Sequence, residues 1–157
     1  MKKSIKRGFG FGITSGIITT LGLMVGLFSG TNSKLAVLGG IIIIAIADAF
    51  SDSFGIHISE ETAGKSKKSV RQSTISAFTT KFLTALIFII PIIFITLKLA
   101  IIINIILGLI LLSIFTLRIT KKKKIRHLFE HLLIAIIVIT ITYFVGIGIN
   151  NLFVWLF

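Results

Sequence analysis

The sequence predicts an all-α membrane protein, an integral bundle of five transmembrane helices. Hydrophobic residues make up 55% of the 157 residues and charged residues only 14%, and the mean hydropathy is +1.07. A soluble domain carries about 25% charged residues, so this chain is too apolar to fold in water. Four apolar stretches each supply the roughly 20 residues that a helix needs to cross the hydrocarbon core, and the longest stretch divides into two spans.

The division of the longest stretch follows from helix geometry. A single helix from Phe82 to Leu117 would be more than about 50 Å long, which exceeds what ordinary tilt accommodates. Pro91 is expected to kink the chain, and Lys98 marks a hairpin between two shorter helices. The expected spans are therefore 8–29, 35–57, 81–97, 99–117 and 128–157, joined by a polar cytoplasmic loop over 58–80, within a single membrane domain, 1–157.

The charge pattern predicts the orientation of these spans. Lys and Arg total 17 against five Asp and Glu, giving a net charge of +12, and basic residues collect in cytoplasmic loops. Five spans place three basic clusters on one side, whereas four spans would carry the last cluster across the membrane. The N-terminus is therefore expected in the cytoplasm and the C-terminus outside. The clusters are Lys2, Lys3, Lys6 and Arg7; Lys65, Lys67, Lys68, Arg71 and Lys81; and Arg118, Lys121, Lys122, Lys123, Lys124 and Arg126.

These basic clusters also indicate the partners of the chain. No aromatic residue interrupts the run from Lys121 to Lys124, so contact with anionic lipid headgroups is expected and nucleic-acid binding is not. The expected location is a cell membrane, or an organelle membrane in a eukaryote.

Two acids stand within the second span. Asp48 lies near its middle and Asp52 follows one helical turn later, so the two carboxyl groups share one face, which Ser51 adjoins. A charged side chain at mid-bilayer costs roughly 2.5–3.5 kcal/mol unless it is paired, protonated or bound to a cation. All Lys and Arg are expected at span ends, so no intramembrane salt bridge is predicted. Either the pair binds a permeant cation or relays protons, or it is a structural pair hydrogen-bonded to hydroxyl groups and backbone.

Other polar residues are expected to line the rest of the ion path across the membrane. Ser15 and Thr19 supply hydroxyl groups on the first span that would line an ion path. Glu60 and Glu61 lie at its expected cytoplasmic entrance, where carboxylates would raise the local concentration of divalent cations. The alternative is that both are solvated loop charges beside Lys65.

The first span is also a glycine helix. One set of glycines, Gly8, Gly12 and Gly16, recurs every four residues, and a second set follows at Gly22, Gly26 and Gly30. Small residues at this spacing let membrane helices approach closely. The glycine faces are expected to pack helices, with Gly12, Gly16, Gly22 and Gly26 central to the contact, and to offer an interface for a symmetric homodimer.

Three segments resemble the vacuolar iron transporter family. Residues 16–27, GIITTLGLMVGL, are similar to its first-helix signature D-G-L-x-T-x-x-G-L-x-x-G. Residues 55–59, GIHIS, resemble its Gly-Glu-Tyr-Ile-Ser helix end, and residues 143–146, YFVG, its Thr-Tyr-x-x-Gly motif. The resemblance implies a divergent member, lacking the cytoplasmic metal-binding domain, that exports cytosolic Fe²⁺ or Mn²⁺ in exchange for protons through a homodimer interface lined by the first two helices.

The departures from that family's pattern bear on the ion. The family's first-helix Asp falls on Ser15, its second-helix Met on Asp52, and its Glu on Ile56. An all-oxygen site of this kind suits Mn²⁺, Mg²⁺ or H⁺ at least as well as Fe²⁺.

The sequence does not predict an enzyme. It has no Cys and three His, and the group formed by His127, Glu130 and His131 lacks the spacing of a zinc hydrolase motif. A proton-coupled divalent cation transporter is the leading hypothesis, with the ion as transported ligand and no resident cofactor. The alternative is a structural membrane protein that transports nothing.

Overall fold

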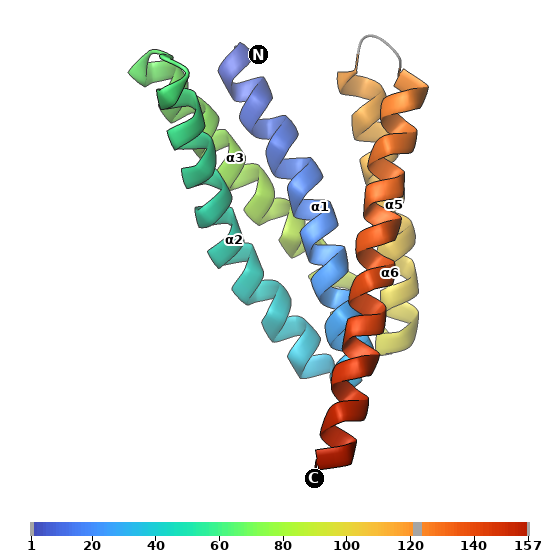
Figure 1. Cartoon of the computed structure of the whole chain (residues 1–157). Coiled ribbons are helices and arrows are strands. Elements are labelled where there is room, and N and C mark those ends of the chain that lie inside the picture. Colours follow the sequence, from blue (N-terminus) through green and yellow to red (C-terminus); the bar gives the residue numbers. More distant parts are fainter. Residues whose placement is uncertain (1, 121–123, 157) are drawn as a thin grey trace.

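The computed structural model describes residues 2–120 and 124–156, and almost all of them are helical (Figure 1). Five helical segments are long and apolar enough to cross a membrane, with α3 and α4 forming one of them together. The predicted all-α bundle of a multi-pass membrane protein is thus confirmed. The helices are α1 (Lys3–Thr31), α2 (Lys34–Thr62), α3 (Lys67–Ile87), α4 (Ile89–Phe94), α5 (Leu97–Ile119) and α6 (Lys124–Leu156).

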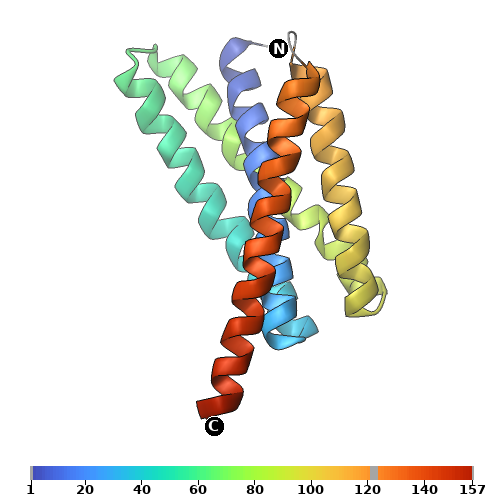
Figure 2. The ribbon, with the colours of Figure 1, turned by 45° about the vertical axis from the view of Figure 1, so that its right-hand side comes forward.

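Helix α1 is the centre of the bundle. It contacts α2, α3, α5 and α6, and in Figure 2 the other helices surround it. Its buried residues include Ile17, Leu21 and Met24, each with no exposed surface. The outer faces of α2, α5 and α6 carry exposed Ile side chains, and α2 and α6 also carry exposed Phe side chains, which is the pattern of helices that face lipid.

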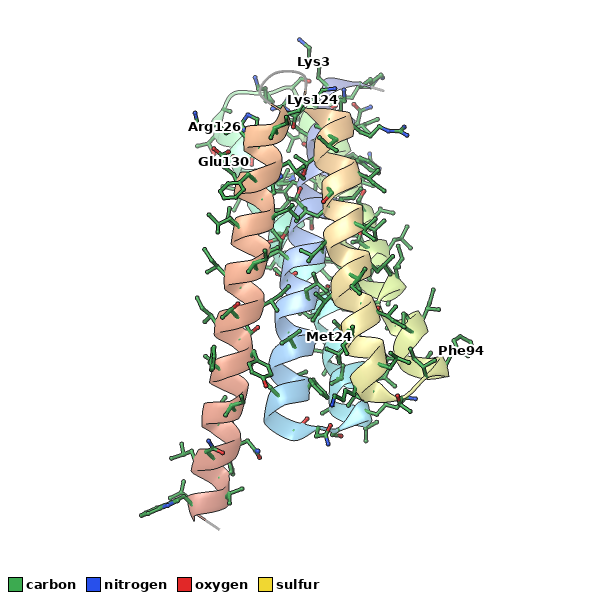
Figure 3. All side chains as sticks on the ribbon, turned by 90° about the vertical axis from the view of Figure 1, so that its right-hand side faces the viewer. Lys3, Met24, Phe94, Lys124, Arg126 and Glu130 are labelled. Atoms are coloured by element: carbon green, nitrogen blue, oxygen red, sulfur yellow. The ribbon has the colours of Figure 1, made fainter. Side chains whose placement is uncertain are left out.

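The described residues of the three basic clusters, apart from Lys81, share one end of the bundle, which we call the basic end. The start of α1, the α2–α3 turn, the end of α5 and the start of α6 lie there, and the end of α6 lies at the opposite end (Figure 1). Lys3, Lys124 and Arg126 mark the basic end in Figure 3, while Met24 and Phe94 lie toward the other end. The predicted odd number of crossings accounts for this arrangement. The cytoplasmic orientation of the basic end stays a prediction, and Lys121, Lys122 and Lys123 lie outside the described residues.

At the opposite end, a lysine caps a helix. Helix α1 ends with its C-cap residue Asn32, which has a left-handed conformation with φ 47°. Two residues later, Lys34 donates hydrogen bonds from Nζ to the backbone oxygens of Ile93 (3.1 Å) and Ile95 (3.3 Å). Ile93 is in the last turn of α4 and Ile95 is its C-cap residue, and the terminal C=O groups of a helix have no intrahelical partner. The charge of Lys34 is therefore used in capping.

The cytoplasmic loop predicted over 58–80 is wrong. Helix α2 continues to Thr62 and α3 begins at Lys67, so only a short turn separates them. Ser66 caps α3 by accepting a hydrogen bond from the backbone nitrogen of Ser69, and Gly64 in the turn has φ 67°. The polar composition misled the prediction, because the Ser and Ala residues of this stretch form the small-residue face of a helix that packs against α1.

The glycines of α1 make this packing possible. A Cβ added at Gly12 would lie 2.7 Å from the backbone oxygen of Ala77 on α3, and one at Gly22 would lie 2.7 Å from Val138 Cγ1 on α6. At Gly26 the nearest atom is the backbone oxygen of Thr142, 3.3 Å away. The first glycine set thus faces α3 and the second faces α6. The predicted packing role is confirmed, but the expectation that these faces form a homodimer interface is wrong, because neighbouring helices of the same chain occupy them.

The third span breaks between α3 and α4, one turn before Pro91. At the break, the fully buried Asn104 of α5 donates a hydrogen bond from Nδ2 to the backbone oxygen of Phe88 (2.8 Å). Pro91 supplies no N–H group to the helix, and Asn104 provides a polar partner where the backbone ladder is interrupted. The hairpin predicted near Lys98 lies just ahead of it, since α4 ends at Phe94 and α5 starts at Leu97.

Candidate functional site

A lysine joins the two intramembrane acids in the middle of the bundle. The Nζ atom of Lys81 lies 2.5 Å from Asp48 Oδ2 and forms a second ion pair with Asp52 Oδ2. Asp48 is at the midpoint of α2 and Lys81 is close to the midpoint of the Lys67–Phe94 span. The prediction that no basic residue lies at this depth is wrong, because α3 begins far earlier than expected and carries Lys81 inward from the predicted span end.

A serine of α1 completes the cluster. Ser15 donates a hydrogen bond from Oγ to Asp52 Oδ2 (2.6 Å) and accepts one from Lys81 Nζ (2.8 Å). Three helices therefore supply the polar atoms: α1 a hydroxyl group, α2 two carboxyl groups and α3 an ammonium group. With all three titratable groups ionised, the cluster carries a net charge of −1.

Close packing of α1 against α3 places the ammonium group. A Cβ added at Gly16 would lie 3.4 Å from Lys81 Cγ and 3.3 Å from the Lys81 backbone oxygen. The stem of Lys81 thus passes over a position that has no side chain. The lysine side chain is only 3% exposed, whereas the side chains of Asp48 and Asp52 are each 25% exposed.

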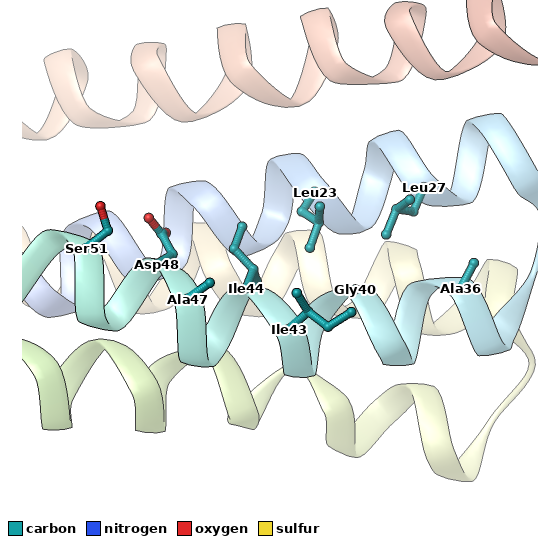
Figure 4. Close-up of a pocket in the computed structure, with 9 residues that line it drawn as sticks. All are labelled: Leu23, Leu27, Ala36, Gly40, Ile43, Ile44, Ala47, Asp48 and Ser51. Carbon is teal, nitrogen blue, oxygen red and sulfur yellow. The ribbon is translucent and has the colours of Figure 1, made fainter.

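The exposed part of Asp48 lines an apolar groove of about 660 Å³ between α1 and α2. Figure 4 shows Asp48 and Ser51 at one end of the groove and Ala36 at the other. The wall between them is apolar and consists of Leu23, Leu27, Gly40, Ile43, Ile44 and Ala47. Asp48 thus lies between a buried lysine on one side and an open groove on the other, whereas Asp52 does not line the groove.

The remaining predicted pathway residues divide between two environments. Ser51 reaches the groove, as the helical stripe implies. The hydroxyl group of Thr19 donates to the backbone oxygen of Ser15 (2.9 Å), one turn earlier on α1. Thr19 therefore satisfies its hydrogen bond within the helix.

Glu60 and Glu61, the predicted entrance pair, differ sharply from each other. Glu60 is 7% exposed and its Oε1 is ion-paired with Arg7. Glu61 is exposed, and its Oε2 lies 3.8 Å from His57 Nε2. The alternative that both are solvated loop charges is wrong for Glu60.

The histidines near the start of α6 form local polar contacts. His127 Nδ1 lies 3.1 Å from Glu130 Oε2, and Arg126 donates from Nε to Glu130 Oε1 (2.8 Å). His131 Nδ1 instead lies 2.9 Å from Thr116 Oγ1 on α5. Within residues 2–120 and 124–156, no group of three or more His, Asp or Glu side chains is arranged to hold a metal ion.

Comparison with known proteins adds no family to this geometry. No family model, curated protein or solved structure matches the chain. The resemblance to the vacuolar iron transporters therefore rests on the three short motifs alone, and it stays a prediction.

Sequence reasoning missed Lys81, although the sequence contains a signal for it. Ser73, Ala77, Lys81 and Ala85 recur every four residues, the same interval as the glycines of α1, and all four are buried in α3. Read as a helix, this stretch has a small-residue stripe with one lysine in its course. The cluster can hold a cation between two carboxylates, and in this structure that cation is the ammonium group of Lys81.

Proposed function

We propose that the protein is a proton-coupled transporter of divalent cations such as Mn²⁺ or Fe²⁺, which exports them from the cytosol, and that the ion binds at Asp48 and Asp52. One observation carries the proposal. A positively charged group, the Lys81 ammonium, lies between these two carboxylates at the middle of the membrane span, beside an open groove. A site that stabilises one cation there has the ligands to stabilise another.

Charge balance explains why protons would be coupled to the metal. The ionised cluster has a net charge of −1, so binding a divalent cation while Lys81 stays protonated would leave +1. Loss of the lysine proton makes the site neutral. Since an uncompensated charge at this depth costs several kcal/mol, metal binding favours release of the Lys81 proton, and reprotonation of Lys81 favours release of the metal.

The donor set determines the class of ion. Asp48, Asp52 and Ser15 offer only oxygen atoms, which suit hard divalent cations such as Mn²⁺ and Mg²⁺. One chain supplies two carboxylates and one hydroxyl group, fewer ligands than these ions take. Under this proposal a second copy faces the groove of the first, so that two Asp pairs flank one pathway in a homodimer.

A structural role is the second candidate, and the same ion pairs favour it. Lys81 is almost fully buried and bonds to both acids and Ser15. A cluster of this kind fixes the relative position of α1, α2 and α3 without any transported ion. In that case the acids would contribute to stability and to nothing else.

Flux measurements distinguish the two candidates. The purified chain is reconstituted in liposomes that contain a metal-sensitive dye, and Mn²⁺, Fe²⁺ and Mg²⁺ uptake is followed with an imposed proton gradient. We expect Asp48→Asn and Asp52→Asn each to lower the flux at least 10-fold. The matched control is Glu130→Gln, which neutralises an acid on α6 outside the cluster and should leave the flux unchanged.

The outcomes separate clearly. No flux of any of these ions through the unmodified protein would exclude divalent cation transport. Unchanged flux in both Asp variants would reject the site. A lowered melting temperature in the Asp variants, with no metal-dependent stabilisation of the unmodified protein and no flux, would support the structural role.

A further inference from the structure

A second charged pocket lies at the basic end, apart from the Asp–Lys cluster. It has a volume of about 530 Å³ and opens between the start of α1, the α2–α3 turn and the end of α5. Four of its six lining residues are cationic: Lys3, Lys6 and Arg7 from α1, and Lys65 from the turn. Gly10 and Ile119 form its apolar wall. We call it the basic pocket.

The basic pocket has an excess of positive charge. No acid lines the pocket among the described residues, and the carboxylate of nearby Glu60 is ion-paired with Arg7. Among the described residues, no salt bridge joins Lys3, Lys6 or Lys65 to an acid. Like charges that converge on one cavity repel each other, and an anion between them removes the repulsion. The pocket therefore has the charge complement of a phosphate group.

Contacts beneath the surface hold the pocket in shape. Glu60 is buried and fixes two of the walls, because its carboxylate binds Arg7 while its backbone oxygen accepts a hydrogen bond from the Lys65 nitrogen (3.1 Å). The start of α1 is tied to α3 by a hydrogen bond from Ser76 Oγ to the backbone oxygen of Ile5 (3.0 Å). The basic side chains thus project from a fixed frame. Glu60, the acid expected at a cation entrance, thus holds a basic residue of this pocket in place.

The position of the pocket identifies the source of the phosphate. It lies at the basic end of the bundle, where α1 begins and α5 ends, and part of its wall is apolar. Beside Gly10, the rings of Phe9 and Phe115 contact each other with centroids 5.7 Å apart. This combination of ammonium and guanidinium groups above an apolar wall matches a phosphate attached to an acyl-bearing glycerol, and basic pockets between membrane helices are a known mode of headgroup recognition.

We propose that the basic pocket binds the phosphate headgroup of an anionic phospholipid, with Lys3, Lys6 and Lys65 as the contacting residues and Glu60 as the residue that positions Arg7. The proposal is independent of cation transport. It assigns a function to part of the positive charge that orientation alone does not require, since any basic residue on this side would serve orientation equally well.

Lipid binding to the intact purified chain tests the proposal. Native mass spectrometry in a neutral detergent compares phosphatidylglycerol with phosphatidylcholine, and we expect one phosphatidylglycerol to bind at least 10-fold more tightly. The triple variant Lys3→Gln, Lys6→Gln, Lys65→Gln should lower phosphatidylglycerol affinity on the order of 100-fold, because each basic residue near an anionic lipid contributes about a factor of five. Phosphatidylcholine binding should not change.

A matched control removes the same charge elsewhere. Lys67, Lys68 and Arg71 are exposed on α3 outside the pocket, and their triple replacement by Gln should lower the affinity less than 3-fold. Equal losses in the two triple variants would overturn the proposal, because attraction would then depend on net charge alone. Displacement of the lipid by millimolar inorganic phosphate would also overturn it, since the site would then take free phosphate. If the pocket variant does not fold, Lys65→Gln alone, in the exposed turn, should give about a five-fold loss.

Discussion

Replacing Lys81 with methionine removes the ammonium group while keeping an apolar stem of similar length. The variant leaves Asp48 and Asp52 facing each other without a cation, and the net charge of the cluster changes from −1 to −2. We expect this substitution to be among the most destabilising in the chain, because two carboxylates at mid-membrane depth would have lost their shared partner.

The structure gives the scale of the effect. Two unit charges 2.5 Å apart, the distance between Lys81 Nζ and Asp48 Oδ2, attract each other by about 7 kcal/mol at an effective dielectric constant of roughly 20. Desolvation of the three groups offsets most of that attraction. Removing one partner of a buried ion pair nevertheless costs about 3–5 kcal/mol, because the other charge stays buried without compensation.

Thermal unfolding in detergent micelles measures the consequence. Lys81→Met should lower Tm on the order of 10 °C, and adding Asp48→Asn and Asp52→Asn should recover most of the loss, because the cluster is then neutral. The control is Lys98→Met at the exposed start of α5, where a change within about 0.5 kcal/mol is expected. A Tm of Lys81→Met equal to that of the unmodified chain would refute the stabilising role of the Lys81 ion pairs, as would a triple variant less stable than the single one.

Two further predictions concern packing and assembly. Gly12→Ala should destabilise the bundle by about 1–3 kcal/mol, because the new Cβ would lie 2.7 Å from an α3 backbone oxygen, whereas Gly39→Ala, with no atom within 4 Å, should be neutral or stabilising in the same melting assay. The chain contains no Cys, so a single Ile43→Cys on the groove side of α2 should form a disulfide-linked dimer under mild oxidation in liposomes. The control is Leu83→Cys on α3, and an equal yield at both positions would indicate random collision and contradict a groove-facing dimer.

The polar stretch after the second span, predicted as a loop, is a part of the fold that the sequence did not predict correctly. Its Ser, Thr and Lys residues predict a loop when hydropathy alone is considered, because an isolated helix of that composition has little reason to enter a membrane. In the structure, Ser73 and Ala77 face the glycines of α1 and are buried by them. Packing against α1 stabilises this segment as a helix despite its polar composition. The sequence of the segment alone does not show that α1 is its packing partner.

For the two acids, the sequence predicted their shared helix face correctly but not their ion-pair partner. The spacing of Asp48 and Asp52 places both on one face of α2, and that face does meet other polar groups. The helical spacing of α2 does not show their ion-pair partner, because Lys81 lies on α3, beyond the α2–α3 connection and several helical turns further along the chain. The glycine motif predicted close packing correctly, but only the fold shows that α3 and α6 occupy its two faces.

The sequence by itself determined that this protein is an all-α bundle with five apolar spans and with most of its described basic residues at one end. These properties follow from hydropathy, span length and the positions of Lys and Arg, each of which is local. The tertiary structure decided that Lys81 bridges Asp48 and Asp52, that Glu60 is buried beneath a basic pocket, and that the glycine faces lie inside the chain. Each of these depends on which helices touch, and close contact at residues without side chains is what brings distant charges within bonding distance.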